Sequence, residues 1–193
     1  VLGVQLHVSD DGGRTFRADG AERIHVDHHA MWVNPHNPNH AIIGNDGGVD
    51  LSLDGGKTWF APPMPWSQFY NVDVDDRLPY RVGGTVQDEG TAMGPSDSLR
   101  AEGIVLGDWQ TAGGGEAGDF GFDGAEVGVV YAGEYGGIMT RWEEGSANER
   151  NISYYPTNPS GHGAEDLRVR FQWTAPLLAS RREPGVIFHG SNI

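Results

Sequence analysis

Apolar and polar residues alternate along parts of the chain with the period of a β-strand. The segment 164–175 is one of the few stretches of a dozen residues without Gly or Pro, and in it Val169, Phe171 and Trp173 alternate with polar residues. Residues two apart share one face of a strand, whereas a helix would need apolar residues three or four apart. With 30 Gly and 11 Pro elsewhere to interrupt helices, the chain is predicted to be all-β.

Two copies of a turn motif punctuate this pattern. The segments 9–16 and 52–59 both fit S-x-D-x-G-x-T-(W/F), and they begin 43 residues apart. Alternating apolar residues lead into each copy, Gly accepts the positive φ of a tight turn, and Asp bonds its own turn backbone. Thr and an aromatic residue then suit the returning strand. Each copy is predicted to be a β-hairpin turn.

A second repeat begins between these motifs and recurs later in the chain. The segment 34–49 aligns without a gap to 123–138, at an offset of 89 residues. Each copy has an exit turn, a short strand ending in Gly, a two-residue polar tip, a Gly pair and the next strand. The segment 180–192 repeats the first half, and a looser copy runs from Asn71 to a longer tip that ends near Gly90.

Repeats of about 40 to 45 residues with four strands each are typical of β-propeller blades. The chain then divides into the end of one blade, three fuller blades and the start of another, at 1–18, 24–62, 68–112, 117–157 and 168–193. The ends could pair to close a four-bladed ring. We favour the other interpretation, a segment of a larger six- or seven-bladed propeller, because the chain begins at Val1 without a leader and stops within a repeat.

Charge and composition exclude several classes of function. The net charge of −14 disfavours nucleic acid and anionic lipid surfaces as partners. The absence of Cys excludes disulfides, thiolate metal sites and thiol nucleophiles. No run of about 18 apolar residues exists, so no membrane span is predicted.

The polar tips are the candidate functional residues. In a propeller, the loops between second and third strands and the loops that enter each blade lie on one face, around the mouth of the channel. Carboxylates, amides and aromatic rings that meet there suit a carbohydrate or another polar ligand. Asp46 with Asp88 is our first acid and base pair, and Asp119 is the reserve. The candidate ligand-binding residues are Asn45, Gln87, His28, His29, Trp109, Glu134, Tyr135, Trp173 and Asn192.

These residues also have structural interpretations. Asn and Asp beside Gly can serve only to make turns, and Trp109 and Trp173 can pack between blades. His25, Asp27 and His29 would share one strand face and are weak candidates for a divalent cation. Since same-face residues are roughly 6.5 Å apart on a strand, the chain would have to bend to bring all three to one ion. No cofactor is required by the sequence.

The chain resembles a known group of proteins over nearly its whole length. The two turn motifs, the stretch 25–59, and the later segments QFYNV, QDEG, GDWQ, GDF and FQWTAP are similar to bacterial Asp-box (BNR-repeat) β-propellers of the glycosyl-hydrolase-like or sortilin-like kind. The resemblance assigns a structural role to the Asp-box residues Ser9, Asp11, Gly13, Thr15, Phe16, Ser52, Asp54, Gly56, Thr58 and Trp59. It also implies an extracellular or periplasmic location.

Two functions follow from this resemblance. Xyloglucanase-like members imply hydrolysis of a polysaccharide by an acid and a base carboxylate, so a glycoside hydrolase is the first expectation. Sortilin-like members imply a non-catalytic propeller that binds a glycan, peptide or protein. Sialidase activity is disfavoured because no Arg cluster occupies the tips. In either case the remaining blades or another chain would close the ring, since open sheet edges tend to pair.

Overall fold

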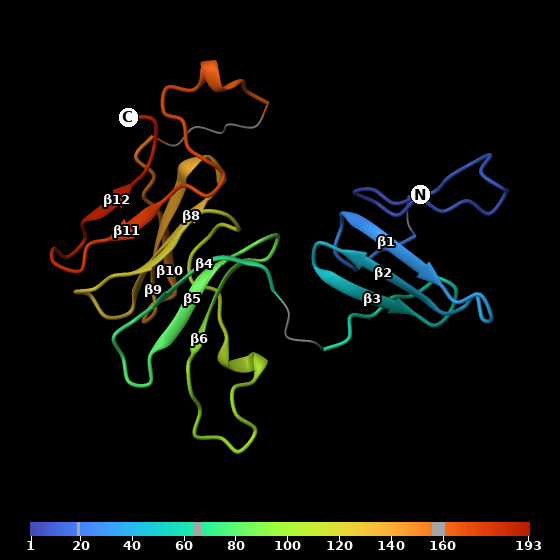
Figure 1. The fold of residues 1–193 in the computed structure, drawn as a ribbon, viewed down its shortest axis with the longest axis horizontal. Helices are drawn as coiled ribbons and strands as arrows, with labels where there is room; N and C mark the ends of the chain where they lie inside the picture. The colour runs from blue at the N-terminus through green and yellow to red at the C-terminus, as the bar shows by residue number, and fades with distance from the viewer. Residues whose placement is uncertain (19, 64–66, 156–160) are drawn as a thin grey trace. The chain divides into compact units, whose positions relative to one another are not determined.

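The computed structural model describes residues 1–18, 20–63, 67–155 and 161–193, and these residues form an all-β fold. The predicted class is therefore confirmed, as several small antiparallel sheets and three 3-10 turns (Figure 1). The chain divides into two compact units, Val1–Ser67 and Gln68–Ile193, which are described separately. Among the described residues, no helix has the length and apolar character needed to cross a membrane.

The first unit contains one three-stranded sheet of β1 (His28–Val33), β2 (Ala41–Asn45) and β3 (Gly48–Ser52). Ile43 is fully buried on one face of it, and Leu6 from the N-terminal segment is also buried. Single bridges, Val8 with Arg17 and Leu51 with Phe60, close the two hairpins that carry the repeated turn motif. Among the described residues, the fourth strand expected beside this sheet is thus reduced to the single bridge of Leu51 with Phe60.

The second unit contains three sheets. They are formed by β4 (Phe69–Val74), β5 (Arg81–Val86) and β6 (Gly90–Pro95); by β7 (Phe120–Phe122), β8 (Val129–Glu134), β9 (Ile138–Glu143) and β10 (Asn148–Asn151); and by β11 (Leu177–Ala179) and β12 (Ile187–His189). Within the described part of this unit, only the middle sheet has four strands, in the order β10-β9-β8-β7. The 3-10 turns are η1 (Leu106–Asp108), η2 (Tyr135–Gly137) and η3 (Ala164–Asp166).

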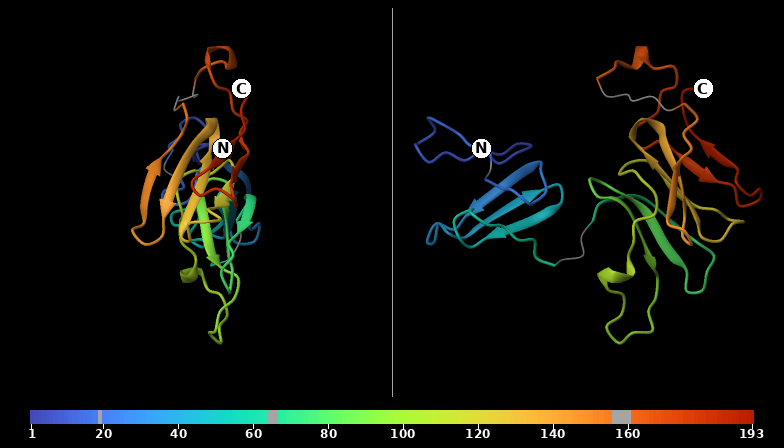
Figure 2. Two further views of the ribbon diagram at one scale, coloured as in Figure 1. Left: turned by 90° about the vertical axis from the view of Figure 1, so that its left-hand side faces the viewer. Right: turned by 180° about the vertical axis from the view of Figure 1, so that it is seen from behind.

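The middle sheet is covered on both faces. Phe120 and Phe122 pack with Met93 and Trp142 in one apolar cluster, and Tyr131 packs with Leu177 in another. Alternation along β7 and β8 explains this, because successive side chains point to opposite faces. β7 contacts β4 on one side and β11 on the other, so the first strands of three successive sheets lie in series. The sheets that contain β5, β8 and β11 can be followed by colour in Figures 1 and 2.

One alternating segment differs from its prediction. Residues 167–176 form no regular strand, and β11 begins only at Leu177. The reason lies in other bonds: Arg170 exchanges backbone and side-chain hydrogen bonds with Asn192, and the indole of Trp173 bonds Tyr70. The alternating residues therefore anchor an irregular segment through their hydrogen bonds and do not mark a β-strand paired along its backbone.

Candidate functional site

Loops at one end of the three sheets of the second unit are joined by hydrogen bonds. The Gln87 N–H donates to the Gln68 carbonyl over 2.9 Å, and the Tyr70 hydroxyl bonds the Gln87 side chain. The Trp173 indole N–H donates to the Tyr70 hydroxyl over 3.0 Å. We call these loops, residues 67–70, 87–90, 113–119, 134–137 and 170–176, the rim.

Two aromatic rings form a flat surface on the rim. The rings of Tyr135 and Trp173 are stacked, with centroids 5.1 Å apart and planes 13° from parallel. Trp173 is 52% exposed, although its indole N–H is held by Tyr70. An oriented, accessible indole is the kind of surface on which the apolar face of a sugar ring can stack. Tyr135 and Trp173 were both expected among the ligand-binding residues.

Carboxyl groups gather beside this aromatic surface. The Asp88 backbone N–H donates to Glu116 Oε2 over 3.1 Å. Burial raises the pKa of Glu116, and the nearby charges of Asp88 and then Glu134 raise it further. Because like charges disfavour ionisation of a neighbour, Glu116 is the member of this cluster best suited to hold a proton.

Glycine brings Glu116 to this position. Gly115 and Gly118 have φ of +102° and +105°, a region that favours glycine. A Cβ on Gly115 would lie 2.2 Å from the Gly133 carbonyl oxygen. The loop therefore approaches the end of β8 more closely than any residue with a side chain would allow.

Asp119 holds strands together in the structure. Its carboxylate accepts the Phe120 N–H over 2.9 Å and the Leu177 N–H over 3.3 Å, and its carbonyl accepts the Gly133 N–H over 2.8 Å. Both carboxylate oxygens are thus used by backbone donors of β7 and β11. This arrangement favours a positioning role for Asp119 over the reserve catalytic role.

The candidate residues of the first unit are divided between interior and surface. Asn45 is buried and bonds Asp50 over 2.8 Å and the Gly47 N–H over 3.0 Å, which closes the β2–β3 turn. His28 is buried, and burial lowers its pKa. His29 is exposed, and its Nε2 contacts the Asp46 carboxylate. Asp46 belongs to the first unit and Asp88 to the second, so their pairing stays a prediction.

The weak metal candidates are not brought together. Within 1–18, 20–63, 67–155 and 161–193, no three or more His, Asp or Glu side chains form a group that could hold a metal ion. His25 and Asp27 precede β1, and Asp27 has a φ of +59°, so the segment does not continue as a strand. The backbone bends at Asp27, and the His29 side chain beyond this bend contacts Asp46.

Two further candidates occupy different surroundings. Trp109 lies against Gly94, where a Cβ would come within 2.5 Å of the indole. Gly94 is near the end of β6 that is remote from the Asp88 turn, so Trp109 packs on the sheet and not on the rim. Asn192 pairs with Arg170: its side-chain oxygen accepts the Arg170 N–H over 2.6 Å, and its own N–H donates to the Arg170 carbonyl over 3.1 Å.

The repeated turns of the first unit use their aspartates internally. Asp54 accepts the N–H groups of Lys57 and Thr58 and the Thr58 hydroxyl, at 3.0, 2.9 and 2.6 Å. Asp11 makes the matching set with Arg14 and Thr15. The Thr58 and Thr15 bonds lower the pKa of the respective aspartate to about 2. These bonds leave the two carboxylates committed to their own turns.

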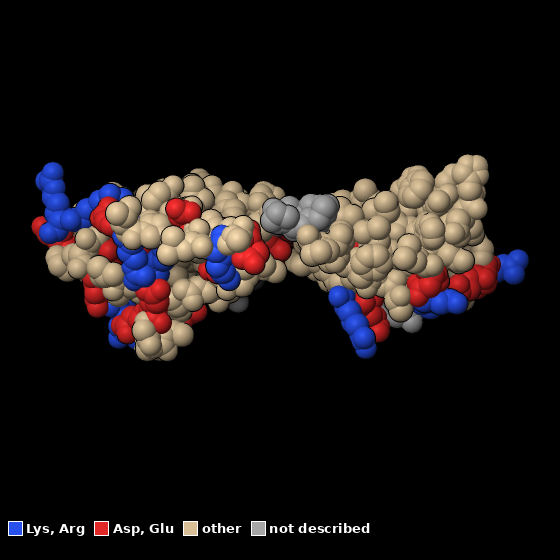
Figure 3. All heavy atoms as spheres, turned by 90° about the horizontal axis from the view of Figure 1, so that it is seen from below, with Lys and Arg blue, Asp and Glu red and all other residues tan. Residues whose placement is uncertain are grey.

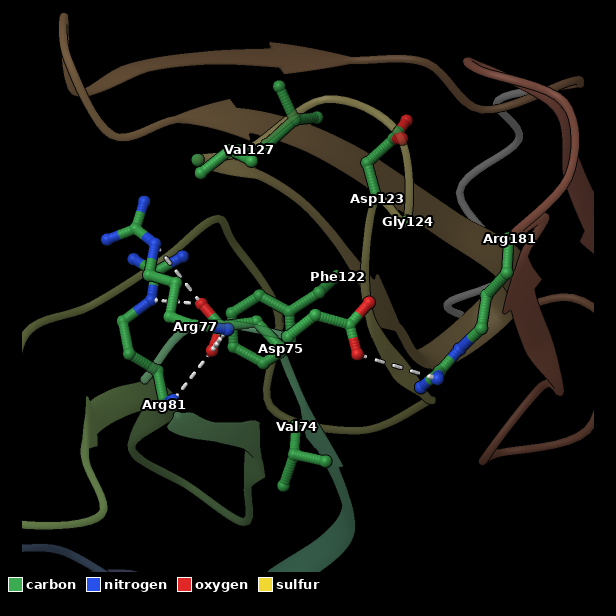
Figure 4. A pocket seen from close by; sticks show the side chains of 12 residues that line it. Val74, Asp75, Arg77, Arg81, Phe122, Asp123, Gly124, Val127 and Arg181 are labelled. Atoms are coloured by element: carbon green, nitrogen blue, oxygen red, sulfur yellow. Dashed lines mark hydrogen bonds and ion pairs between the residues drawn. The ribbon is translucent and has the colours of Figure 1, made fainter. Parts of the chain in front are cut away.

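A second polar region lies at the opposite end of the same sheets. A cavity of about 110 Å³ is lined by Arg77, Arg81 and Arg181 together with Asp75 (Figure 4). Arg81 Nε lies 2.7 Å from Asp75 and its Nη1 2.9 Å from Glu144. Acidic and basic side chains also adjoin over much of the second unit in Figure 3. Since each of these arginines has an acidic partner, the region cross-links sheets and offers no net positive charge.

The sequence pattern missed two rim residues. Glu116 was not selected, although it is the sole carboxylate within the glycine-rich run 113–118, a signal that a loop makes a close approach. Arg170 was assigned to the polar side of a strand. Its contact with the Asn192 tip could not be deduced from spacing, and it places one Arg at a tip where none was expected.

Comparisons with known proteins do not identify a relative. No protein-family model matches the chain, and no curated protein matches it at a significant level. The geometry of the rim therefore carries the functional argument.

Proposed function

We propose that the chain is part of a carbohydrate-active β-propeller that holds a polysaccharide at the rim and hydrolyses its glycosidic bond with rim carboxyl groups. One observation carries this proposal: the exposed Trp173 ring, stacked on Tyr135, lies on the same set of loops as the Asp88–Glu116 contact. Stacking would orient a sugar, and a proton-carrying acid beside it would serve bond cleavage. The same proposal places the protein outside the cytoplasm and requires no cofactor.

The propeller part of the proposal has its own support. The first strands β4, β7 and β11 contact one another in series, as the innermost strands of consecutive blades would. The two turns that resemble the Asp-box in sequence share one hydrogen bond, from the Thr hydroxyl to the turn aspartate, and this likeness supports their being equivalent repeats. Closure of the ring would need further blades or another chain.

In the hydrolytic mechanism, Glu116 is the acid. Its proton would pass to the glycosidic oxygen as that oxygen leaves the anomeric carbon, while a water attacks that carbon and gives a proton to a second carboxylate. Such pairs stand about 5 Å apart in retaining enzymes and roughly 6.5 to 9.5 Å apart in inverting ones. Glu134 is the candidate second carboxylate, because its charge raises the pKa of Glu116 and no hydrogen bond joins the two side chains. The pair Asp46 and Asp88 remains the alternative assignment.

A second function is favoured by a different observation. Glu116 Oε2 already accepts the Asp88 backbone N–H over 3.1 Å, so this carboxyl group also holds its loop against the Asp88 turn. A rim in which the acids serve only to bind hydroxyl groups would make the protein a non-catalytic, sortilin-like module for a glycan, peptide or protein.

One experiment separates these functions. Binding and reducing-end release are measured on a panel of plant and bacterial polysaccharides for the wild type, Trp173→Ala and Glu116→Gln. Trp32→Ala is the matched control, because Trp32 is 51% exposed but lies in the first unit. The hydrolase predicts loss of binding in Trp173→Ala only, and loss of release with retained binding in Glu116→Gln.

The other outcomes are equally informative. Binding without release by the wild type would select the binding module. Unchanged release by Glu116→Gln would show that Glu116 is not the acid. Asp46 and Asp88 would then be the carboxylates to replace. Absence of binding to every polysaccharide, or equal loss in Trp32→Ala, would refute the proposal.

A further inference from the structure

A hollow lies beside the aromatic surface of the rim, between the segment before β11 and the residues after β12. It measures about 450 Å³ and is lined by Arg170, Phe171, Gln172, Pro176, Ser191 and Asn192 among others. The volume is ample for one sugar ring, and Trp173 follows the lining residue Gln172 directly in the chain.

The walls of this hollow are fixed. The paired hydrogen bonds between Arg170 and Asn192 hold the backbone of both residues. Phe171 lies over Gly137, where a Cβ would be 2.2 Å from its ring, and stacks on His189 with centroids 4.7 Å apart. A ligand would therefore meet a preformed surface, which keeps the entropic cost of binding low.

Two side-chain donors of the hollow are unused, whereas a third, the Ser191 hydroxyl, donates to the Ile193 carbonyl over 2.8 Å. Among the described residues, the Arg170 guanidinium has no ion pair or hydrogen bond, and neither does the Gln172 amide. This contrasts with Arg77, Arg81 and Arg181, which all face acidic partners. An unpaired guanidinium presents donors in a planar fork that matches a carboxylate with two parallel hydrogen bonds.

Charge makes Arg170 stand out on the rim. The rim segments contain Asp88, Glu89, Glu116, Asp119 and Glu134, and Arg170 is their one Arg or Lys. We propose that this hollow is a subsite for an acidic sugar, a uronic acid whose carboxylate pairs with Arg170 while Gln172 and Asn192 bond its hydroxyl groups. The inference rests on the proposed function and deepens it by naming the substrate class, a uronate-containing polysaccharide.

The net charge of the chain opposes nonspecific binding of an acidic polysaccharide. At −14, the protein as a whole repels polyanions. Retention of an acidic polysaccharide would consequently have to come from a local site and not from general attraction.

The test measures binding of the full chain to three probes: polygalacturonate, dextran sulfate and neutral hydroxyethylcellulose. The variants are Arg170→Gln, Arg170→Lys and the charge-matched control Arg182→Gln, which alters an exposed residue in the β11–β12 turn at the other end of the strands. We expect the wild type to bind polygalacturonate most tightly. Loss of a charge-assisted bidentate contact should weaken that binding roughly tenfold or more in Arg170→Gln, less in Arg170→Lys, and not in Arg182→Gln.

Each contrary result has a separate meaning. Equal binding of polygalacturonate by wild type and Arg170→Gln, or preference for the neutral probe, would overturn the acidic subsite while leaving the proposed function standing. Preference for dextran sulfate would assign the hollow to sulfate esters and reject the uronate. Failure to bind any probe or any polysaccharide of the wider panel would refute the proposed function itself.

Discussion

The packing of consecutive sheets in the second unit predicts that Gly83→Ala destabilises the protein. Gly83 lies in β5, and a Cβ there would come within 2.4 Å and 2.5 Å of two ring carbons of Phe120. Phe120 is 3% exposed and meets Phe122 edge to face, with centroids 5.4 Å apart. Because the ring is buried in the cluster with Met93 and Trp142, the added methyl group must displace packed side chains.

The magnitude follows from two opposing effects. Overpacking of a core costs typically 1–3 kcal/mol. Replacing Gly by Ala in a strand returns roughly 0.5–1 kcal/mol, because the unfolded chain loses freedom, and the φ of Gly83 does not oppose a side chain. We expect a net loss of about 1–2 kcal/mol in the free energy of unfolding of the second unit.

Urea unfolding followed by circular dichroism measures this loss. Gly107→Ala is the control, because Gly107 has no atom within 4 Å of an added Cβ and no positive φ; it should be neutral or slightly stabilising. Phe120→Leu in the Gly83→Ala background should recover part of the stability, since the smaller side chain leaves room. Equal stability of Gly83→Ala and Gly107→Ala would refute the contact between β5 and β7, and with it the serial arrangement of the sheets.

Three other predictions follow from charged groups. Burial raises the pKa of Glu116, so folding takes up a proton between the ordinary and the raised pKa, and the free energy of unfolding falls as pH rises through this window. Glu116→Gln should therefore be more stable than wild type at neutral pH and should lose this advantage in acid. Chemical unfolding measured across pH tests this. The pKa of Asp54 is lowered from 3.8 to about 2, so ionised Asp54 stabilises the folded first unit at neutral pH and this contribution is lost as pH falls from 3.8 towards 2. Asp54→Asn should lower the melting temperature of the first unit at pH 7 and match wild type near pH 2. Arg81 is 8% exposed and its Nε lies 2.7 Å from Asp75. Arg81→Leu should cost about 1–3 kcal/mol in urea unfolding, because the buried Asp75 carboxylate loses its nearer guanidinium and keeps Arg77 at 3.4 Å. Unchanged stability of Arg81→Leu would contradict this.

Local chemistry made much of the fold predictable. The Ser-Asp-Gly turns could be recognised because their hydrogen bonds join residues within four positions, as Asp54 and Thr58 do. The strands β2 and β8 could be placed because alternation and terminal glycines bound them. The missing fourth strands could not be anticipated, since Phe60 and Gln110 form single bridges whose extension depends on what packs beside them.

The site was predictable only in part. Gln87, Glu134 and Tyr135 lie at turns that repeats reveal, and Trp173 was selected because its segment was expected to enter a blade. Glu116 and Arg170 escaped because their roles depend on contacts with residues 28 and 22 positions away. The roles of Asn45 and Asp119 depend on which atoms accept backbone or side-chain donors, and a sequence pattern carries no record of that.

The most direct test of the proposed carbohydrate binding at the rim is the indole N–H signal of Trp173 in a two-dimensional NMR titration with polysaccharide fragments. This signal is assigned by its absence in Trp173→Ala. Its hydrogen bond to Tyr70 should keep this signal visible, and ligand stacking on the ring should shift it while the Trp32 signal stays in place. A titration in which the wild type binds the fragments but the Trp173 signal does not move, or in which no fragment binds, would contradict the account.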